Sequence, residues 1–305
     1  MQCKCGSDIV YYRRYEARGY CMKCFLDSVE KKFRRTVSKN KLIRKGDKVA
    51  VAVSGGKDSL SMLYLLNGIA KGFSLISFSV DEGISGYRPK GIECAAELAR
   101  FLGIEHHVYS YRKEIGMEMD SLEELAGKKV KNCTYCGVFR RYVLNKKARE
   151  LGAAKLAVGH NLDDEAQSVM MNFVRGDLNR FSRLGASPGE SPKFVPRIKP
   201  LRDIPEKEIA AYAVLKGIKF SGDECPHSFD NVRRDMQGVL NDFELKYPGT
   251  KQQVVGFYDR LRGSLPLPGG SLKECEECGE PSSGALCKAC ELLFSLKVKR
   301  PDQSS

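Results

Sequence analysis

The sequence lacks a long apolar segment. None of its apolar runs approaches the ~18 residues that a membrane-spanning helix needs. Cysteines stand near the N-terminus, where a signal peptide would have its apolar region. We therefore expect no membrane association and a cytoplasmic location. The 305 residues, 42% hydrophobic and 29% charged, are typical of a soluble globular protein with one large domain or two ordinary ones.

Acidic residues are fewer than basic residues in this sequence. The 38 Asp and Glu face 51 Lys and Arg, which leaves a net charge of +13. This excess favours a polyanionic partner, nucleic acid first, over a membrane surface, because no amphipathic anchor is visible. A basic charge can also serve solubility alone. However, much of it gathers in "VEKKFRRTVSKNKLIRKGDK", where phosphate contact is a better explanation than a solvated helix face.

Twelve cysteines stand mostly in close pairs, which indicates disulfides or metal. The missing secretion signal favours metal in a reducing compartment. Two clusters lie at the ends of the chain: Cys3, Cys5, Cys21 and Cys24, then Cys275, Cys278, Cys287 and Cys290. Each fits a tetrahedral zinc ion, and four protein ligands leave no open position for catalysis. We predict two structural Zn2+ sites.

Three further cysteines form a less regular group. Cys133 and Cys136 begin a predicted helix, and Cys225 lies far downstream beside His227. The residues alone allow a zinc site that uses His227, a redox disulfide within the first pair, or buried unreactive thiols. The last alternative is disfavoured by Gly137 and the two arginines that follow it. Cys94 stands alone in the helical stretch "GIECAAELARFLG" and is predicted to be a core thiol.

Short apolar strands alternate with amphipathic helices between the outer clusters. The predicted strands are "KVAVAV", "FSLISFSVDEG", "IEHHVYS" and "KLAVGHN", and helices are predicted between and after them. This alternation predicts an α/β fold, a doubly wound parallel sheet with helices on both faces and ligands at the carboxyl ends of the strands. In "DDEAQSVMMNFVRG" the buried face is predicted to hold Ala166, Val169, Met170, Phe173 and Val174.

Two later segments complete the catalytic part. "LGASPGESPKFVP" reads as a mobile basic loop, with Arg175, Arg180, Arg183 and Arg197 around it. In "VRRDMQGVLNDFELKY" the predicted buried face is Val232, Met236, Val239, Leu240 and Phe243.

The strand that ends at Val53 runs into the glycine turn "SGGKDS" and then into a helix. Backbone NH groups and a helix N-terminus in this arrangement can bind a phosphate. The turn is too short for the P-loop of kinases and is not a dinucleotide Gly-x-Gly-x-x-Gly. "SGGKDS" instead resembles the pyrophosphate loop of N-type ATP pyrophosphatases, which cut ATP between its α and β phosphates and activate a carbonyl oxygen by adenylation.

Four other stretches narrow the resemblance. "NCTYCGVFRRYVLN", "VGHNLDDEAQSVMMNFVRGD", "PRIKPLRDIPEKEI" and "GDECPHS" are together similar to the tRNA 2-thiolation enzymes of the cytosolic thiouridylase group. The resemblance covers nearly the whole chain, including zinc modules at both ends.

The resemblance implies a nucleotide site. The β and γ phosphates would be held by Ser54, Gly55, Gly56, Lys57, Asp58 and Ser59. Val53, Val80 and Asp81 would lie beside the adenosine, and Gly159, His160 and Asp164 would border the nucleotide. Asp163 and Asp164 also stand in the first turn of a helix, where acids commonly cap the dipole, and Asp164 there can also bind the Mg2+ that bridges ATP oxygens.

The resemblance also implies that Cys133, Cys136 and Cys225 hold a [4Fe-4S] cluster with one iron free to bind hydrosulfide. ATP would adenylate uracil O2, and sulfur held at that iron would then replace it. Some relatives carry lysine where Arg140 stands. Because arginine keeps its proton, we assign Arg140 electrostatic stabilisation, with Asp164 as the second catalytic residue.

The predicted organisation has six parts: an N-terminal zinc module (1–27), a basic connecting helix (28–48), the ATP pyrophosphatase domain (49–222), a helical part with the third cluster cysteine (223–268), a C-terminal zinc module (269–296) and a disordered tail (297–305). The predicted activity is ATP-dependent tRNA 2-thiouridine synthesis at the wobble uridine. The alternatives are a T-loop uridine, an anticodon-loop cytidine, or a non-catalytic tRNA-binding iron-sulfur protein. Expected partners are tRNA and a sulfur donor, either a ubiquitin-like thiocarboxylate protein or free sulfide, and relatives are commonly homodimers.

Overall fold

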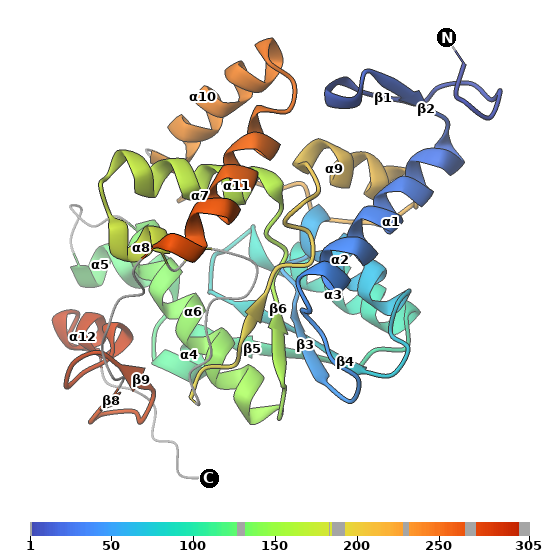
Figure 1. The fold of residues 1–305 in the computed structure, drawn as a ribbon. Helices are drawn as coiled ribbons and strands as arrows, with labels where there is room; N and C mark the ends of the chain where they lie inside the picture. The colour runs from blue at the N-terminus through green and yellow to red at the C-terminus, as the bar shows by residue number, and fades with distance from the viewer. Residues whose placement is uncertain are drawn as a thin grey trace.

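A parallel five-stranded sheet forms the centre of the molecule (Figure 1). The computed structural model describes residues 2–126, 132–182, 184, 193–227, 232–265 and 273–298. The sheet order is β5 (His106–Ser110), β4 (Ser74–Asp81), β3 (Lys48–Ala52), β6 (Lys155–Ala157) and β7 (Arg197–Ile198). All four pairings are parallel. The predicted fold class is confirmed.

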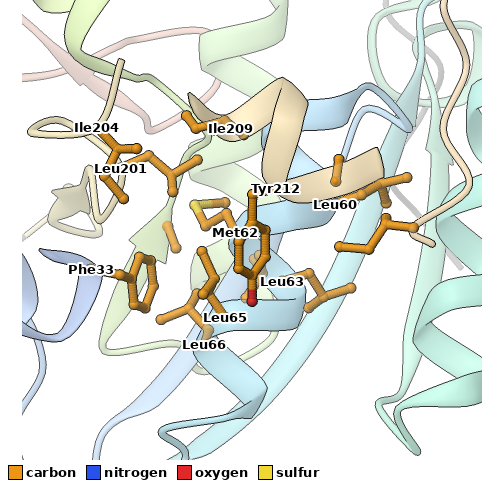
Figure 2. Packing of buried hydrophobic residues seen from close by; sticks show 14 of the residues in the cluster. Phe33, Leu60, Met62, Leu63, Leu65, Leu66, Leu201, Ile204, Ile209 and Tyr212 are labelled. Atoms are coloured by element: carbon orange, nitrogen blue, oxygen red, sulfur yellow. The ribbon is translucent and has the colours of Figure 1, made fainter. Parts of the chain in front are cut away.

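Helices cover both faces of the sheet. Successive strand residues point to opposite faces, so Val49 and Val51 belong to one core and Ala50 to the other. The first face is covered by α1 (Met22–Lys39), α2 (Lys57–Asn67), α3 (Arg88–Phe101) and α9 (Glu206–Leu215). Figure 2 shows Tyr212 of α9 lying across the leucines of α2 in this core.

The second face is covered mainly by α6 (Asn132–Glu150). Its buried Phe139 and Val143 pack against Phe78 and Val80 of β4. Shorter elements lie beside it: α4 (Tyr111–Ile115), a 3-10 turn at Met119–Ser121 and α5 (Leu122–Ala126). The N-terminus of α6 thereby lies against the sheet, and this helix carries the first two of the middle cysteines.

A group of four helices follows the strands at one end of the sheet. It contains α7 (Leu162–Val174), α8 (Leu178–Ser182), α10 (Val232–Lys246) and α11 (Thr250–Leu261), followed by a 3-10 turn at Arg262–Ser264. Leu162, Ala166, Leu240 and Val255 form a core shared by α7, α10 and α11, and Phe181 of α8 packs beside it with Val169 and Tyr258. This group places the start of α7 beside the glycine turn.

Both ends of the chain are small modules of the same design. The first is a hairpin of β1 (Tyr11–Arg13) and β2 (Arg18–Tyr20), joined by a 3-10 turn at Arg14–Glu16 and followed by α1. The last is a hairpin of β8 (Lys273–Glu274) and β9 (Pro281–Ser282) followed by α12 (Lys288–Ser295). They lie at opposite sides of the molecule (Figure 1). One docks on α9 and the other on α6.

Several expectations about helices need correction. Phe173 and Val174 at the end of α7 are 67% and 68% exposed, and Val232, Val239 and Phe243 of α10 are 45%, 51% and 54% exposed. In α10 only Leu240 is buried, because the helix packs on α7 along a narrow line. The basic helix expected at 28–48 is α1, which begins at Met22 within the first cysteine cluster and ends at Lys39.

Two other expectations concern the chain around β7. Most of the loop "LGASPGESPKFVP", together with Arg183, lies outside the described residues. Arg197 is part of the edge strand β7 rather than of a loop. Among the described helices, none is long and apolar enough to cross a membrane.

Candidate active site

The glycine turn has a backbone that only glycine permits. Gly55 has a φ of +83°, and a Cβ there would lie 2.0 Å from the carbonyl oxygen of Gly91. A Cβ on Gly91 would in turn lie 2.6 Å from the carbonyl oxygen of Ser54. The turn therefore packs directly on the backbone of α3, and both positions exclude a side chain.

The turn ends at a helix N-terminus that is open to an anion. Ser59 Oγ accepts a hydrogen bond from Ser54 N at 3.0 Å and donates to Gly56 O at 3.0 Å, which closes the turn from inside. No side chain among the described residues caps α2 at Gly56. The first NH groups of α2 thus remain available to a phosphate.

Lys57 and Asp58 lie at the mouth of the turn. Lys57 Nζ lies 2.7 Å from Glu206 Oε1 and 3.1 Å from Asp58 Oδ2. Asp58 Oδ1 accepts a hydrogen bond from Asn161 Nδ2 at 3.1 Å. Burial raises the pKa of Asp58, and Lys57 only partly offsets this. The turn therefore presents one cation and two carboxylates where the phosphates and Mg2+ of a nucleotide would enter.

The two acids at the start of α7 have different tasks. Asp163 is buried, accepts a hydrogen bond from Glu206 N at 2.8 Å and pairs with Lys251. Asp164 forms a capping box with Asn161, and its Oδ1 lies 3.4 Å from Arg233 Nη1. Burial raises the pKa of Asp164. Asp163 thus fastens α9 and α11 to α7, and Asp164 keeps a partly exposed carboxylate at the N-terminus of α7.

The remaining predicted nucleotide residues surround the same turn. Val53 and Val80 are buried at the ends of β3 and β4, and Asp81 Oδ1 accepts a hydrogen bond from Gly83 N at 2.9 Å. A Cβ on Gly159 would lie 3.1 Å from Ser59 Cα, so the β6 loop touches the glycine turn. The carboxyl ends of three neighbouring strands, β4, β3 and β6, therefore meet here.

His160 and Arg140 are surrounded by protein and yet accessible. His160 is exposed, but the surrounding protein lowers the pKa of its ring to about 4, with a further contribution from Lys199. Arg140 is 47% exposed; desolvation by the surrounding protein opposes its charge, but Glu82 outweighs this and raises the pKa of the guanidinium. Accessible side chains that are nonetheless desolvated are expected in a cleft. His160 is neutral at physiological pH.

The middle cysteines come together at the start of α6. Burial raises the pKa of Cys133, Cys136 and Cys225, and each thiol is close enough to another to raise it further. Cys133 Sγ lies 3.3 Å from the carbonyl oxygen of His227. The structure thus brings Cys225 to the pair Cys133 and Cys136, which lies far from it in the sequence.

The spacing of these three thiols differs from that of a mononuclear zinc site. Among the described residues, two groups have metal-ligand atoms that all lie within 4.8 Å of one another, and both are terminal four-cysteine clusters. The middle trio is more widely spaced. His227 is also occupied, since its Nδ1 lies 3.2 Å from Asn132 Nδ2 and its Nε2 3.2 Å from Asp120 Oδ1. The donor set therefore fits a polynuclear iron-sulfur group better than one zinc ion.

A buried carboxylate links the cysteines to the glycine turn. Glu82, fully buried at the end of β4, accepts hydrogen bonds at Oε1 from Arg140 Nε and Arg88 Nη2, both at 2.9 Å. Arg140 Nη2 lies 3.1 Å from Cys136 Sγ, and Arg88 Nη1 donates to Ser54 O at 3.1 Å. Glu82 and Arg88 were missed in the sequence. Their signal was the acid directly after the β4 strand, at the sheet edge where ligands bind.

The terminal clusters match tetrahedral zinc. Sulfur contacts run from 3.5 Å for Cys5–Cys21 to 3.7 Å for Cys5–Cys24 at one end, and from 3.4 Å for Cys275–Cys290 to 3.6 Å for Cys278–Cys287 at the other. Zn–S bonds of ~2.3 Å imply a sulfur spacing of about 3.8 Å. Cys21 and Cys287 each occupy the N-cap of the following helix.

A glycine turn at the end of β3, with three cysteines beside it that suit a metallocofactor, is the arrangement expected of a PP-loop protein. The PP-loop domain family matches residues 26–237. Among curated proteins, the chain is 38% identical to the tRNA 2-thiolation protein NcsA of Haloferax volcanii, with 98% of this chain and 100% of that protein covered. It is 33% identical to the tRNA-5-methyluridine(54) 2-sulfurtransferase of Pyrococcus horikoshii, with 99% and 98% covered.

A solved structure agrees with these relatives. The U34-tRNA thiolase NcsA from Methanococcus maripaludis, determined with its [4Fe-4S] cluster, matches with a TM-score of 0.86 at 36% identity over 100% of this chain and 99% of that one. The chain belongs to the family of tRNA 2-thiolation proteins, which are PP-loop sulfurtransferases.

Proposed function

We propose that this protein is an ATP-dependent tRNA 2-thiouridine synthase that acts on the wobble uridine. The observation that carries the proposal is the connection Cys136–Arg140–Glu82–Arg88–Ser54, which joins the cysteine trio to the phosphate turn. One cleft can then serve both the activation of an oxygen and its replacement by sulfur.

The phosphate turn supports the activation half. The NH groups of Gly56 and of the first turn of α2, with Lys57, would hold the β and γ phosphates of ATP. Asp58 and Asp164 would hold Mg2+ with their carboxylate oxygens. The uracil O2 would attack the α phosphorus, and pyrophosphate would leave with the electrons of the broken P–O bond. Val53 and Val80 at the strand ends would border the adenosine, with Asp81, Gly159 and His160 beside them.

The cysteine trio supports the replacement half. A [4Fe-4S] cluster on Cys133, Cys136 and Cys225 would keep one iron without a protein ligand, where hydrosulfide can be held. Attack of sulfur on C2 would expel AMP, which adenylation has made a good leaving group. Arg140 lies against Cys136 Sγ and is held in place by Glu82. Because it keeps its proton, it would stabilise negative charge on the oxygen that leaves.

The wobble position is favoured by the likeness to the U34-tRNA thiolase over the whole chain. The P. horikoshii relative acts on position 54 and is nearly as similar, so a T-loop uridine is the second candidate. An anticodon-loop cytidine and a non-catalytic tRNA binder are weaker alternatives. The intact Lys57, Asp58, Ser59 and Asp164 argue against a vestigial site.

The remaining parts of the proposal concern cofactors, partners and location. We infer structural Zn2+ in both terminal clusters, tRNA bound in part by the exposed Lys31, Arg34, Arg35 and Lys39 of α1, and residence in the cytoplasm. The sulfur donor is a thiocarboxylate protein or free sulfide, and the assembly is a homodimer.

Nucleoside mass spectrometry tests the function. The reconstituted protein, given unmodified tRNA, ATP, Mg2+ and sulfide under anaerobic conditions, is expected to form 2-thiouridine at position 34 and one AMP per thiolated base. Asp164→Asn should reduce the rate at least ~100-fold, because it removes the charge that holds Mg2+. If 2-thiouridine formed at position 54 instead, the substrate would be the T-loop uridine. If the protein bound tRNA but formed no thiolated product, the proposed enzymatic activity would be refuted.

A further inference from the structure

Two arginines beside the cysteine trio have no carboxylate partner. Among the described residues, no Asp or Glu oxygen lies within 4.0 Å of the guanidinium of Arg141 or Arg197. Their cationic neighbours are compensated. Glu82 holds Arg140, Asp177 lies 3.2 Å from Arg180, and Glu165 lies 2.6 Å from Lys199.

The fold brings the two arginines together. Arg197 precedes Ile198 on the edge strand β7, and since Ile198 is buried against the α1, α2 and α9 side, Arg197 points toward α6. Its Nη2 donates to the carbonyl oxygen of Arg141 at 3.1 Å. The Arg141 side chain folds back over its own helix, where its Nη1 lies 3.4 Å from a Cβ built on Gly137.

The surroundings of the two arginines disfavour their positive charges. Burial lowers the pKa of Arg197 to about 10, and the nearby Arg141 contributes. The Arg141 side chain is exposed and that of Arg197 is half-buried, yet the protein packed around Arg141 lowers the pKa of its guanidinium, with further contributions from Arg140 and Arg180. Both arginines stay protonated at neutral pH. Neighbouring cations disfavour each other's charged form, and an anion bound between the two arginines would offset this repulsion.

We propose that Arg141 and Arg197 form a clamp for one backbone phosphate of the tRNA next to the target uridine. The inference deepens the proposed function and rests on it. The planar guanidinium fork matches a phosphate diester, and Arg141 folds its guanidinium back beside Gly137, the residue that follows Cys136. A phosphate fixed here would hold the uridine in the cleft between the cysteine trio and the glycine turn.

The phosphates of ATP are a poorer fit for this clamp. They are accounted for by the turn after β3, whereas Arg197 stands on β7, with β6 between the two strands. Neighbouring strands are ~4.8 Å apart, so β7 is about 10 Å from β3. Free hydrosulfide is a smaller anion and does not need a pair of forked donors.

Binding of an anticodon stem-loop RNA to the cluster-loaded protein tests the clamp. Arg141→Gln and Arg197→Gln should each weaken binding ~3- to 10-fold. Each should also make the negative slope of log K against log salt shallower by ~0.7, because one phosphate contact is lost. Arg100→Gln is the matched control, because Arg100 is an exposed arginine on α3 at the opposite face of the sheet. Neither clamp variant should melt earlier than the parent, since each removes an uncompensated charge.

A phosphate scan identifies the partner of the clamp. Replacing backbone phosphates one at a time with neutral methylphosphonate should weaken binding to the parent protein at one position beside the uridine. For RNA with the methylphosphonate at that position, Arg197→Gln should bind no more weakly than the parent protein does. Such non-additive losses show that the arginine and the phosphate interact. Additive losses at every position, or variants that bind RNA like Arg100→Gln, would overturn the clamp.

Two side measurements separate the alternatives. An unchanged RNA affinity with a raised KM for ATP or for sulfide would assign the arginines to those anions and also overturn the clamp. Thiolation by the parent protein is measured in parallel. A parent that binds RNA but forms no 2-thiouridine would refute the proposed function, whereas an active parent with unaffected clamp variants would refute the clamp alone.

Discussion

The terminal cysteine clusters and the middle cysteine trio use the same ligand for opposite purposes. At the ends, four sulfurs lie in mutual contact, Cys275 and Cys290 are buried, and Cys275 Sγ accepts a hydrogen bond from Cys287 N at 3.2 Å. In the middle, three sulfurs are spaced more widely, Cys133 is exposed and Arg140 lies against Cys136. The geometry of the terminal clusters suits a closed metal site, whereas that of the middle trio suits the open metal site proposed above.

The two terminal modules also support different parts of the candidate site. Arg13 of the first module donates two hydrogen bonds to the carboxylate of Glu208 on α9, from Nη2 at 2.7 Å and from Nε at 3.0 Å. Tyr15 and Lys32 contact the same carboxylate. Glu280 of the last module binds Asn145 Nδ2 of α6 at 3.0 Å and also pairs with Arg149. One module therefore supports α9 beside Lys57, and the other supports the helix of the cysteine trio.

The largest effect is expected from opening a closed site. Replacing Cys275 and Cys290 together with serine removes half of the ligands, and structural zinc contributes on the order of 10 kcal/mol to small modules of this kind. Zinc content should fall from two ions to one, and hydrogen exchange should show the C-terminal module unfolded. Unchanged zinc and an unchanged exchange pattern would show that the cluster is not a metal site.

At the middle cysteine trio we expect a smaller change in free energy than at the zinc clusters but a nearly complete loss of thiolation. Cys225→Ser should reduce thiolation by ~1,000-fold, equivalent to about 4 kcal/mol of transition-state stabilisation. The reason is that only two cysteine ligands remain, which are too few to retain the proposed cluster. Zinc content and melting temperature should stay at parental values. Cys94→Ser is the control, since Cys94 lies half-buried beside the first core, apart from the three metal-ligand groups. Equal losses in both variants would contradict the comparison.

The smallest effects are expected at the two docking carboxylates, and they should differ. Glu208→Gln leaves Arg13 without its buried partner and should cost about 3 kcal/mol in urea unfolding. Glu280→Gln should cost about 1 kcal/mol, because Arg149 is 43% exposed and water screens the pair. The double variant Arg13→Met with Glu208→Leu should recover most of the first loss. If it unfolds like Glu208→Gln, the network is not the cause.

The strand and helix alternation and the glycine turn could be predicted because each is a local pattern. The strands from Lys48, Ser74 and His106 and the helices between them fall where the sequence placed them. "SGGKDS" could be predicted as a phosphate turn, since the φ of Gly55 and the contact with Gly91 demand small residues there. The pairing of cysteines in both terminal clusters was visible in their spacing.

Other features depend on contacts between distant residues. The Glu82 link requires Arg88 and Arg140 to converge on one carboxylate from separate helices, which no spacing in the sequence reveals. The exposed apolar residues of α10 follow a helical period, but α7 covers only the line through Leu240. The edge strand β7 is too short for a periodic signal, so the position of Arg197 came from the fold alone.

Metal analysis of anaerobically reconstituted protein is the most direct test of this account. The parent should contain about four iron atoms and two zinc ions per chain, and the variant with Cys133, Cys136 and Cys225 changed to serine should keep both zinc ions and lose all iron. A third zinc ion in the parent, with no iron and undiminished thiolation, would contradict the claim that the middle cysteines form an open iron-sulfur site.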